Sequence, residues 1–232
     1  MIRVENIKKT FSKRMIIESV SFTAKKGECL ALCGGNGAGK STILKMLTGI
    51  HMPDEGNISL NGVEAKRHSI SYRDQFAYMP DDLTFHPLVT GLEALRFSAE
   101  LQKIAHGRVE EVLELTGLVE HADKRVKTYS KGMQQRLSFA QSLLSNAPVL
   151  FLDEPTNGLD PYWVHRLKEI IIEQKRVGQT ILFTTHMLPI VEQLADRLVF
   201  LQDGGLLVNE SVERLLKRNE SLDRALFSEY VK

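Results

Sequence analysis

The sequence contains little cysteine and no long hydrophobic run, and it has no excess of charge of either sign. Cysteine occurs twice in 232 residues, at Cys29 and Cys33. In an extended strand these positions lie about 13 Å apart, at ~3.3 Å per residue, which is too far for a disulfide bond. This scarcity excludes a disulfide framework and a cysteine-rich metal site, and it favours a reducing compartment.

No hydrophobic run approaches the ~20 residues that a membrane span requires. Met1 to Asn6 lack the apolar stretch of a secretory signal. The chain has 30 basic and 29 acidic residues, so its net charge of +1 does not indicate a nucleic acid or an anionic membrane as partner. The 43% of hydrophobic residues suffices for a substantial core. We therefore expect a cytoplasmic globular protein with no nucleic-acid partner.

One short motif indicates the chemistry. The segment 34–42 reads GGNGAGKST and fits the phosphate-binding pattern G-x-x-x-x-G-K-[ST]. Glycines let successive backbone N–H groups close around phosphate oxygens, Lys40 adds a positive charge, and Ser41 can ligate Mg²⁺. An apolar strand precedes the motif and helical spacing follows it, neither of which a flexible Gly-rich linker would need. We expect a nucleoside triphosphate to contact Gly34, Asn36, Gly37, Ala38, Gly39, Lys40, Ser41 and Thr42.

A second motif consists of two carboxylates that follow an apolar strand. Residues 149–152 read VLFL, and Asp153 and Glu154 come directly after them. A buried parallel strand delivers such residues to the carboxyl edge of a sheet. Asp153 is predicted to hold Mg²⁺, directly or through water, and Glu154 to polarise the water that attacks the γ-phosphate. The alternative is a strand that ends in a solvated turn, but a P-loop in the same chain favours the catalytic interpretation.

The remaining pattern indicates an α/β protein. Short strands at 15–17 and 20–22, separated by polar turns, are expected before a turn at 25–27. A strand at 57–60 precedes the hairpin signal Asn61-Gly62, and apolar residues at helical spacing from 90 to 120 indicate a helical insertion. Elements then alternate as in a parallel sheet, with strands at 149–152, 180–184 and 198–201 and helices at 161–175 and from 189 onward.

The segment 129–136 carries a family resemblance. It reads YSKGMQQR and is similar to the LSGGQ signature of the ATP-binding cassette family. With the P-loop and the acidic strand in the same order, the chain resembles the nucleotide-binding subunits of ABC transporters over essentially its whole length. A helix after the signature would direct its N-terminus at a phosphate, Ser130 could donate its hydroxyl, and Gly132 permits close backbone approach. The resemblance implies that the signature of one subunit completes the ATP site of another.

Further motifs agree with this family. Residues 157–160 read NGLD and resemble the D-loop, so Asp160 is expected at the interface between two cassettes. His186, which follows the segment 183–185, resembles the switch histidine that contacts the γ-phosphate. Phe11 matches the aromatic residue that stacks on adenine, and a core phenylalanine is the alternative. The other histidines are expected to be surface or packing residues.

The resemblance implies a single ABC ATPase domain over residues 1–232. Its fold class is α/β, a P-loop NTPase (RecA-like) core with an antiparallel β subdomain and an inserted α-helical subdomain. The core with its β subdomain is expected at 1–78 and 149–210. The helical subdomain with the signature is expected at 79–148, and a C-terminal helical tail at 211–232.

Some positions depart from the common family pattern. Asp81 follows the segment YMP at 78–80, where the family commonly has a glutamine that senses Mg²⁺ and water. An aspartate can still contact the metal, but it is shorter and adds negative charge near the triphosphate. Lys131 and Met133 in the signature, together with Asp81, are similar to an exporter-type subgroup that serves drug, haem, sodium or copper-maturation permeases. A narrower hypothesis, from residues 129–161, is an ATPase for copper-site maturation.

The function implied by the resemblance is that of the ATPase subunit of a multi-subunit ABC transporter, with ATP and Mg²⁺ as cofactors and Lys40, Glu154 and His186 in catalysis. ATP would close a dimer of two cassettes, expected to be a homodimer, and hydrolysis would reopen it. Transmembrane permease subunits would dock around residues 81–97 and hold the ATPase at the cytoplasmic face of the membrane, with export as the expected direction. Ordinary packing of the apolar residues there is the alternative. The rival function is a soluble ABC-family ATPase that acts on a non-membrane partner.

Overall fold

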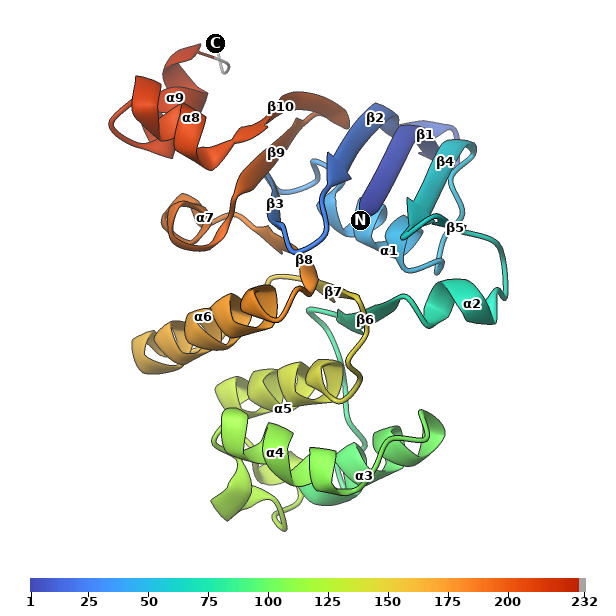
Figure 1. Cartoon of the computed structure of the whole chain (residues 1–232), viewed down its shortest axis with the longest axis vertical. Helices are drawn as coiled ribbons and strands as arrows, with labels where there is room; N and C mark the ends of the chain where they lie inside the picture. Colours follow the sequence, from blue (N-terminus) through green and yellow to red (C-terminus); the bar gives the residue numbers. More distant parts are fainter. Residues whose placement is uncertain (230–232) are drawn as a thin grey trace.

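The computed structural model describes residues 1–229, so the last three residues of the predicted tail, 230–232, lie outside the described part. The elements form two β-sheets and a group of helices at the end of the molecule opposite to the smaller sheet (Figure 1). Among residues 1–229, no helix combines the length and the apolar character needed to cross a membrane.

The larger sheet has six strands and brings distant motifs to one edge. Its order is β10 (Gly205–Ser211), β9 (Arg197–Gln202), β3 (Cys29–Gly34), β8 (Thr180–Thr185), β7 (Val149–Leu152) and β6 (Phe76–Met79). Neighbouring strands are parallel except for β10 and β9, which are antiparallel. The carboxyl ends of the parallel strands therefore meet at one edge, where the P-loop, the acidic pair and the predicted switch histidine follow β3, β7 and β8.

Strand β3 separates two hydrophobic cores. Its side chains point alternately to the two faces of the sheet, because successive residues of a strand alternate. Cys29, Ala31 and Cys33 belong to the core that also contains the apolar residues of the helical region. Leu30 and Leu32 belong to the other core, between the two sheets. A strand that is buried on both faces reads as the continuous apolar run seen in the sequence.

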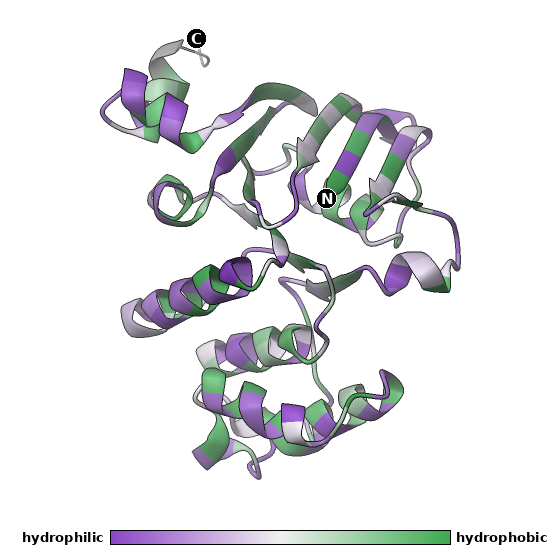
Figure 2. Ribbon diagram, viewed as in Figure 1, coloured by the Kyte–Doolittle hydropathy of each residue, from purple (hydrophilic) through white to green (hydrophobic). Residues whose placement is uncertain are grey.

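The smaller sheet covers the helix that follows the P-loop. It is antiparallel and consists of β2 (Arg14–Ala24), β1 (Ile2–Phe11), β4 (Glu55–Leu60) and β5 (Val63–Glu64), in that order. Apolar residues of helix α1 (Lys40–Leu47) lie in the core between the two sheets. The alternation of hydrophobic and hydrophilic residues along β1, visible in Figure 2, leaves one face of this sheet to solvent.

The prediction of two short strands at 15–17 and 20–22 is wrong, because both segments are parts of the single strand β2. The pairing of β2 with β1 runs from Ile2 opposite Ala24 to Phe11 opposite Arg14. Register shifts interrupt this pairing between Val4 and Thr10 of β1. With these shifts, β2 stays paired to β1 through the polar residues that separate its two apolar segments, 15–17 and 20–22.

Helices form the opposite end of the molecule. They are α3 (Gly91–Leu101), α4 (Gly107–Leu115) and α5 (Lys131–Leu143), with short 3-10 turns at Val119–His121 and Val126–Thr128. Helix α2 (Ile70–Arg73) lies apart from them, beside β5 and β6, and its Tyr72 is buried in the core between the two sheets. The start of α3 is fixed by a capping box, because the Thr90 side chain accepts from the Glu93 backbone while Glu93 reaches back to the Thr90 backbone. The helical pattern predicted from 90 to 120 thus comprises two helices, the second of which starts at Gly107.

The remaining helices pack on the same side of the large sheet as α5. They are α6 (Pro161–Arg176), α7 (Leu188–Leu194), α8 (Val212–Arg218) and α9 (Leu222–Glu229). A cation–π contact joins α5 to α6, since the guanidinium of Arg136 lies 4.0 Å from the centre of the Trp163 ring. Arg136 also donates to the carbonyls of Thr116 and Gly117 at 3.0 and 3.1 Å, so it ties the end of α4 to the same junction.

Candidate active site

The P-loop has backbone geometry that only glycine adopts readily at three of its positions, Gly34, Gly37 and Gly39. Gly34 has φ of 151°, and a Cβ there would lie 2.5 Å from the carbonyl oxygen of Leu201. Gly39, the residue before α1, has φ of 102°, and a Cβ there would collide with Ile17. At Gly35 a Cβ would meet nothing within 4 Å, so packing of the protein itself does not require glycine there.

Lys40, the first residue of α1, is buried and folds back over the loop. Its Nζ donates to the carbonyl oxygens of Gly34 and Gly35 at 2.8 and 3.2 Å. These bonds place the ammonium group beside the loop amides, where it can exchange carbonyl oxygens for phosphate oxygens.

A cavity of about 540 Å³ unites most of the predicted site residues. It is bounded by the P-loop, by the end of β1, and by the segments that follow β6, β7 and β8. The lining residues are Phe11, Arg14, Ile16, Asn36, Gly37, Ala38, Gly39, Lys40, Ser41, Thr42, Asp81, Glu154, Asn157 and His186.

Phe11 stands at the rim of this cavity and is 39% exposed, so the alternative of a core phenylalanine is wrong. Its ring meets the ring of His51 edge-on, with centroids 5.2 Å apart. The Nζ of Lys9 lies 5.3 Å from the centre of the Phe11 ring. An exposed aromatic ring held by such neighbours can present a flat surface to a base.

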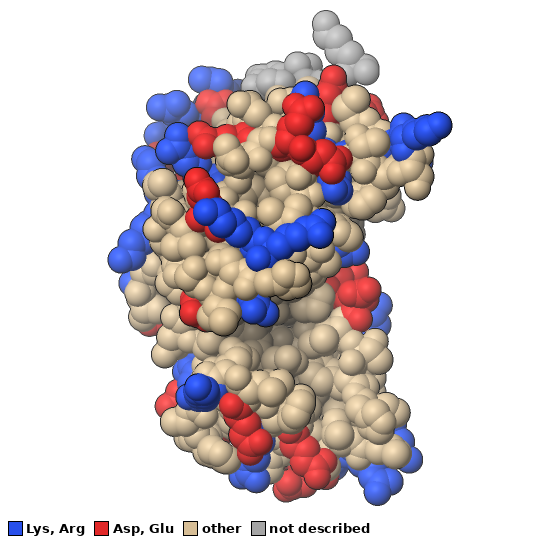
Figure 3. All heavy atoms as spheres, turned by 90° about the vertical axis from the view of Figure 1, so that its right-hand side faces the viewer, with Lys and Arg blue, Asp and Glu red and all other residues tan. Residues whose placement is uncertain are grey.

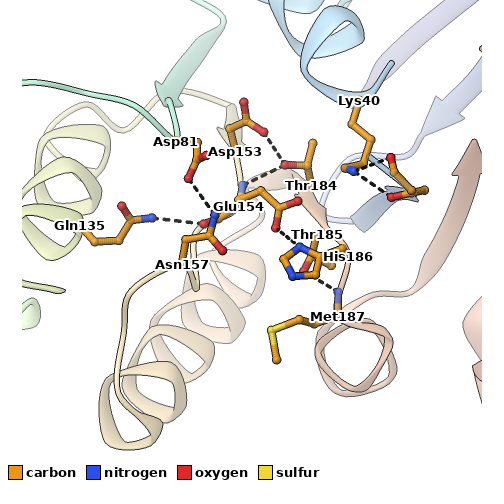
Figure 4. Close-up of polar contacts among 12 residues, drawn as sticks. Lys40, Asp81, Gln135, Asp153, Glu154, Asn157, Thr184, Thr185, His186 and Met187 are labelled. Carbon is orange, nitrogen blue, oxygen red and sulfur yellow. Dashed lines mark hydrogen bonds and ion pairs between the residues drawn. The ribbon is translucent and has the colours of Figure 1, made fainter. Parts of the chain in front are cut away.

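The acidic pair after β7 is organised by one threonine. The Thr184 hydroxyl donates to Oδ1 of Asp153 at 2.6 Å and accepts from the Glu154 backbone N–H at 2.9 Å (Figure 4). Asp153 is only 5% exposed. Burial raises the pKa of its carboxyl group, the negative charge of Asp81 adds to this rise, and the Thr184 hydrogen bond and Lys40 oppose it.

Glu154 begins a sharp turn and faces His186. Its backbone has φ of 45°, a left-handed value that is uncommon for residues other than glycine. Oε2 of Glu154 lies 3.1 Å from Nδ1 of His186 (Figure 4). The Glu154 side chain is 13% exposed and that of His186 is 57% exposed, so the histidine lies on the solvent side of the carboxylate.

Asp81 and Asn157 bring two further loops together. Asn157 donates from Nδ2 to Oδ1 of Asp81 at 2.9 Å. Gln135, on α5, donates from Nε2 to the backbone carbonyl of Glu154 at 3.2 Å. The loop after β7 is thus bonded both to the loop after β6 and to the helix that carries the signature (Figure 4).

The predicted site residues of the signature and D-loop, Ser130, Gly132 and Asp160, lie outside the cavity lining. Ser130 caps α5, where its Oγ accepts from the Met133 backbone at 3.2 Å. Asp160 caps α6, where Oδ1 accepts from the Trp163 backbone at 2.9 Å. A Cβ at Gly132 would lie 2.9 Å from the carbonyl oxygen of Gly158, so these two loops pack directly against each other.

Comparison with known families decides the identity. A model of the family described as ABC transporter matches residues 17–157. The chain belongs to the ABC transporter family. As a member of this family it is an ATP-binding ATPase, and its hydrolysis of ATP to ADP and phosphate is coupled to transport.

Individual relatives and a solved structure agree. The chain is 34% identical over 211 residues to the linearmycin resistance ATP-binding protein LnrL of Bacillus subtilis (strain 168), covering 89% of this chain and 68% of that protein. It is 36% identical over 216 residues to the lantibiotic transport ATP-binding protein SrtF of Streptococcus pyogenes, covering 92% of each. A solved ATP-binding subunit of an ABC transporter superimposes with a TM-score of 0.90 at 31% identity, covering 98% of both chains. The predicted fold class is therefore confirmed.

Two residues of the ABC ATPase site escaped prediction from the sequence. Thr184 contacts both acids, and Asn157 holds Asp81. The signal for Thr184 was a polar residue at the end of an apolar strand that runs parallel to the acidic strand, with Leu152 opposite Phe183. The Asn157 contact had no local signal, because its partner lies 76 positions away in the sequence.

Proposed function

We propose that this ABC ATPase binds Mg²⁺ and ATP in the cavity beside the P-loop and uses hydrolysis to drive an exporter. The observation that carries the proposal is that one cavity is lined at once by the P-loop, Glu154 and His186. Phosphate-binding groups and a candidate base thus share a single space.

The P-loop supplies binding of the triphosphate. Its backbone amides form an anion-binding nest, and the N-terminus of α1 directs its partial positive charge at the same point. Lys40 leaves its contacts with Gly34 and Gly35 and pairs with phosphate oxygens. Phe11 receives the adenine ring at the opposite rim of the cavity.

Glu154 acts as the base and His186 holds it in place. A carboxylate beside the γ-phosphate accepts the proton of the attacking water as the bond to phosphorus forms. Through its contact with Oε2, His186 fixes the rotamer of Glu154 and presents its other ring nitrogen to the cavity. The threonine-held backbone at Glu154 keeps this geometry rigid.

The side chains near the P-loop fit a magnesium ion. Asp153 is a buried carboxylate that has a hydroxyl but no cationic group bonded to it among the described residues, Ser41 supplies a hydroxyl, and Asp81 supplies a second carboxylate. These are the hard oxygen ligands that Mg²⁺ prefers. Residues 1–229 contain no group of three or more His, Cys, Asp or Glu suited to a metal, so phosphates would supply further ligands. Bound there, the ion would neutralise charge on the phosphates.

Two copies of the chain would be needed for a complete site. Ser130, Gly132 and Asp160 belong to helix starts that lie outside the cavity of their own chain. In a head-to-tail pair, the start of α5 in one copy would face the γ-phosphate bound by the other. ATP would then act as part of the interface and favour the closed pair.

An open groove beside the helical end is the proposed docking surface for a permease. It has a volume of about 1360 Å³ and lies between α2, the end of α3 and the segment 144–148. Figure 3 shows this face hollowed at mid-height, with Lys and Arg side chains above the hollow. Ile70 and Leu101, which line the groove, expose 68% and 70% of their surface, and Phe97, which belongs to the predicted docking segment 81–97, exposes 63%. A cytoplasmic helix of a membrane subunit would cover these apolar side chains and hold the ATPase at the membrane.

Export is supported by the name of a further relative, the Nod factor export ATP-binding protein I of Burkholderia lata, which is 36% identical over 226 residues. The names of LnrL and SrtF concern linearmycin resistance and lantibiotic transport. Neither name concerns copper-site maturation, and no contact in the structure distinguishes a cargo, so the proposal does not extend to copper.

The test uses the Glu154→Gln variant, loaded with Mg²⁺ and ATP and isolated with its partners from detergent-solubilised membranes. We expect a stoichiometric multi-span protein by mass spectrometry, and a matched pull-down of Ile70→Glu/Leu101→Glu should lose it. Recovery of ribosomes or soluble protein alone would contradict the transporter and favour a soluble ABC ATPase.

A further inference from the structure

A hydrogen bond joins the two loops that border the acidic side of the cavity. Asp81 lies just after β6, where the chain leaves the sheet for the helical end, and Asn157 lies between β7 and α6. The Asn157 amide donates to Oδ1 of Asp81 at 2.9 Å (Figure 4). The direction of the bond is unambiguous, because an ionised carboxylate can only accept.

Asn157 is itself held by the turn that starts at Glu154. Its backbone N–H donates to the Glu154 carbonyl at 3.0 Å, and the same carbonyl accepts from Gln135 at 3.2 Å. The left-handed backbone of Glu154 directs the chain into this turn. The position of the Asn157 side chain is therefore tied to that of Glu154.

The Asn157 amide meets an electrostatic need of this site. Asp81 adds a second carboxylate near that of Asp153, because the two acids follow the neighbouring parallel strands β6 and β7. Like charges at short range repel, so Asp81 would swing toward solvent unless something retained it. A neutral donor retains the carboxylate without cancelling its charge. Among the described residues Oδ2 of Asp81 has no hydrogen-bond partner, so one oxygen is fixed and the other is available.

We propose that Asn157 is a positioning residue for Asp81, which it holds so that Oδ2 is available to the water or ion beside the phosphates. Held in this way, Asp81 can contact the water or ion at a position where the family commonly has the longer glutamine. Because Asn157 also bonds to Glu154, the base and the Asp81 carboxylate move as one unit. This inference rests on the proposed function of the same cavity.

The test measures ATP affinity twice for each variant, once with Mg²⁺ and once with EDTA, by equilibrium binding of a fluorescent ATP analogue. The ratio of the two affinities isolates the contribution of the metal. We expect Asn157→Ala to lower this ratio by about tenfold, the scale of a hydrogen bond to a charged group, with the EDTA affinity unchanged within about twofold. Asn157→Asp keeps the shape of the side chain but adds charge, so it should lower the ratio further.

A double-mutant cycle separates positioning from general damage. Asp81→Ala should lower the ratio as Asn157→Ala does, and the double variant should be no worse than Asp81→Ala alone. Matched controls are Asn57→Ala, an exposed asparagine on β4, and Asp123→Ala, an exposed acid in the segment before α5. Both should keep the ratio of the unmodified chain.

Additive losses in the cycle, or a ratio unchanged in Asn157→Ala and Asn157→Asp, would overturn the positioning role while leaving ATP binding by the cavity intact. If the unmodified chain bound no ATP in either medium, the proposed function would fail, and this inference with it. Electron paramagnetic resonance of Mn²⁺ bound with ATP gives a second readout: Asn157→Ala is expected to change the spectrum, and Asn57→Ala is expected to leave it unchanged.

Discussion

Nδ1 of His186 lies 3.1 Å from Oε2 of Glu154 and joins the ends of two neighbouring parallel strands. The histidine is half exposed at the rim of the cavity, whereas the carboxylate is largely buried. The pair thus places a solvent-facing imidazole against the group proposed to activate water.

Replacing Glu154 by glutamine should separate binding from hydrolysis. The amide has the same size but cannot accept a proton from water, so we expect turnover to fall by roughly 10²-fold or more with ATP affinity retained. Phosphate release and nucleotide binding measure the two quantities. Glu173→Gln, an exposed acid on α6, is the control. Unchanged turnover in Glu154→Gln would contradict the role of the base.

His186→Ala should act through Glu154. Turnover should fall by at least about tenfold with little change in ATP affinity, because the rotamer of Glu154 is no longer fixed. In a Glu154→Gln background the same change should have almost no further effect. His165→Ala, an exposed histidine on α6, should leave turnover intact. A full additional loss in the double variant would show that His186 acts independently.

Lys40→Ala should weaken ATP binding itself, because it removes the charge that faces the phosphates. A loss of at least about tenfold is expected, since a charge-assisted hydrogen bond is worth more than ~1.4 kcal/mol. Isothermal titration with ATP measures it. Lys26→Ala changes a lysine in the turn before β3 and should bind as the unmodified chain does. Equal affinities of Lys40→Ala and Lys26→Ala would refute the assignment.

Thr184→Val should destabilise the fold and slow hydrolysis. Valine has the shape of threonine but leaves Asp153 and the Glu154 amide without their shared partner, at a cost of about 1–3 kcal/mol. Urea unfolding measures the free energy, and Thr184→Ser, which restores the hydroxyl, should recover most of it. If serine and valine behaved alike, shape rather than the hydroxyl would be the important property.

The same variant should show a pH dependence of stability. Burial raises the pKa of Asp153, and loss of the Thr184 hydrogen bond should raise it further. A carboxyl that binds its proton more tightly in the folded state loses stability as pH rises through its folded pKa. The deficit of Thr184→Val relative to the unmodified chain should therefore be larger at about pH 7 than at about pH 4. An equal deficit at both pH values would contradict the electrostatic origin.

The sequence alone predicts those parts of the molecule that are encoded locally. The P-loop, the acidic pair and the start of α6 at Pro161 are each defined by adjacent residues, so their elements could be assigned with bounds close to those observed. The sequence pattern predicts two strands in place of β2 because polar residues interrupt its apolar pattern, whereas register shifts in its pairing with β1 let the single strand continue. The contact between Asp81 and Asn157 and that between Arg136 and Trp163 depend on folding at long range, so neither could be foreseen.

The close packing of Gly132 on Gly158 has a consequence for cooperativity. One short loop carries Glu154, which lines the cavity proposed to bind the nucleotide of its own chain, and Gly158, which contacts the helix start proposed to face the nucleotide of the other chain. Binding of ATP at one site would therefore shift the backbone of this loop and, through its contact with Gly132, change the ATP affinity of the second site. A pair of such subunits should respond to ATP with a steep, sigmoidal curve, and enlarging Gly132 should flatten it.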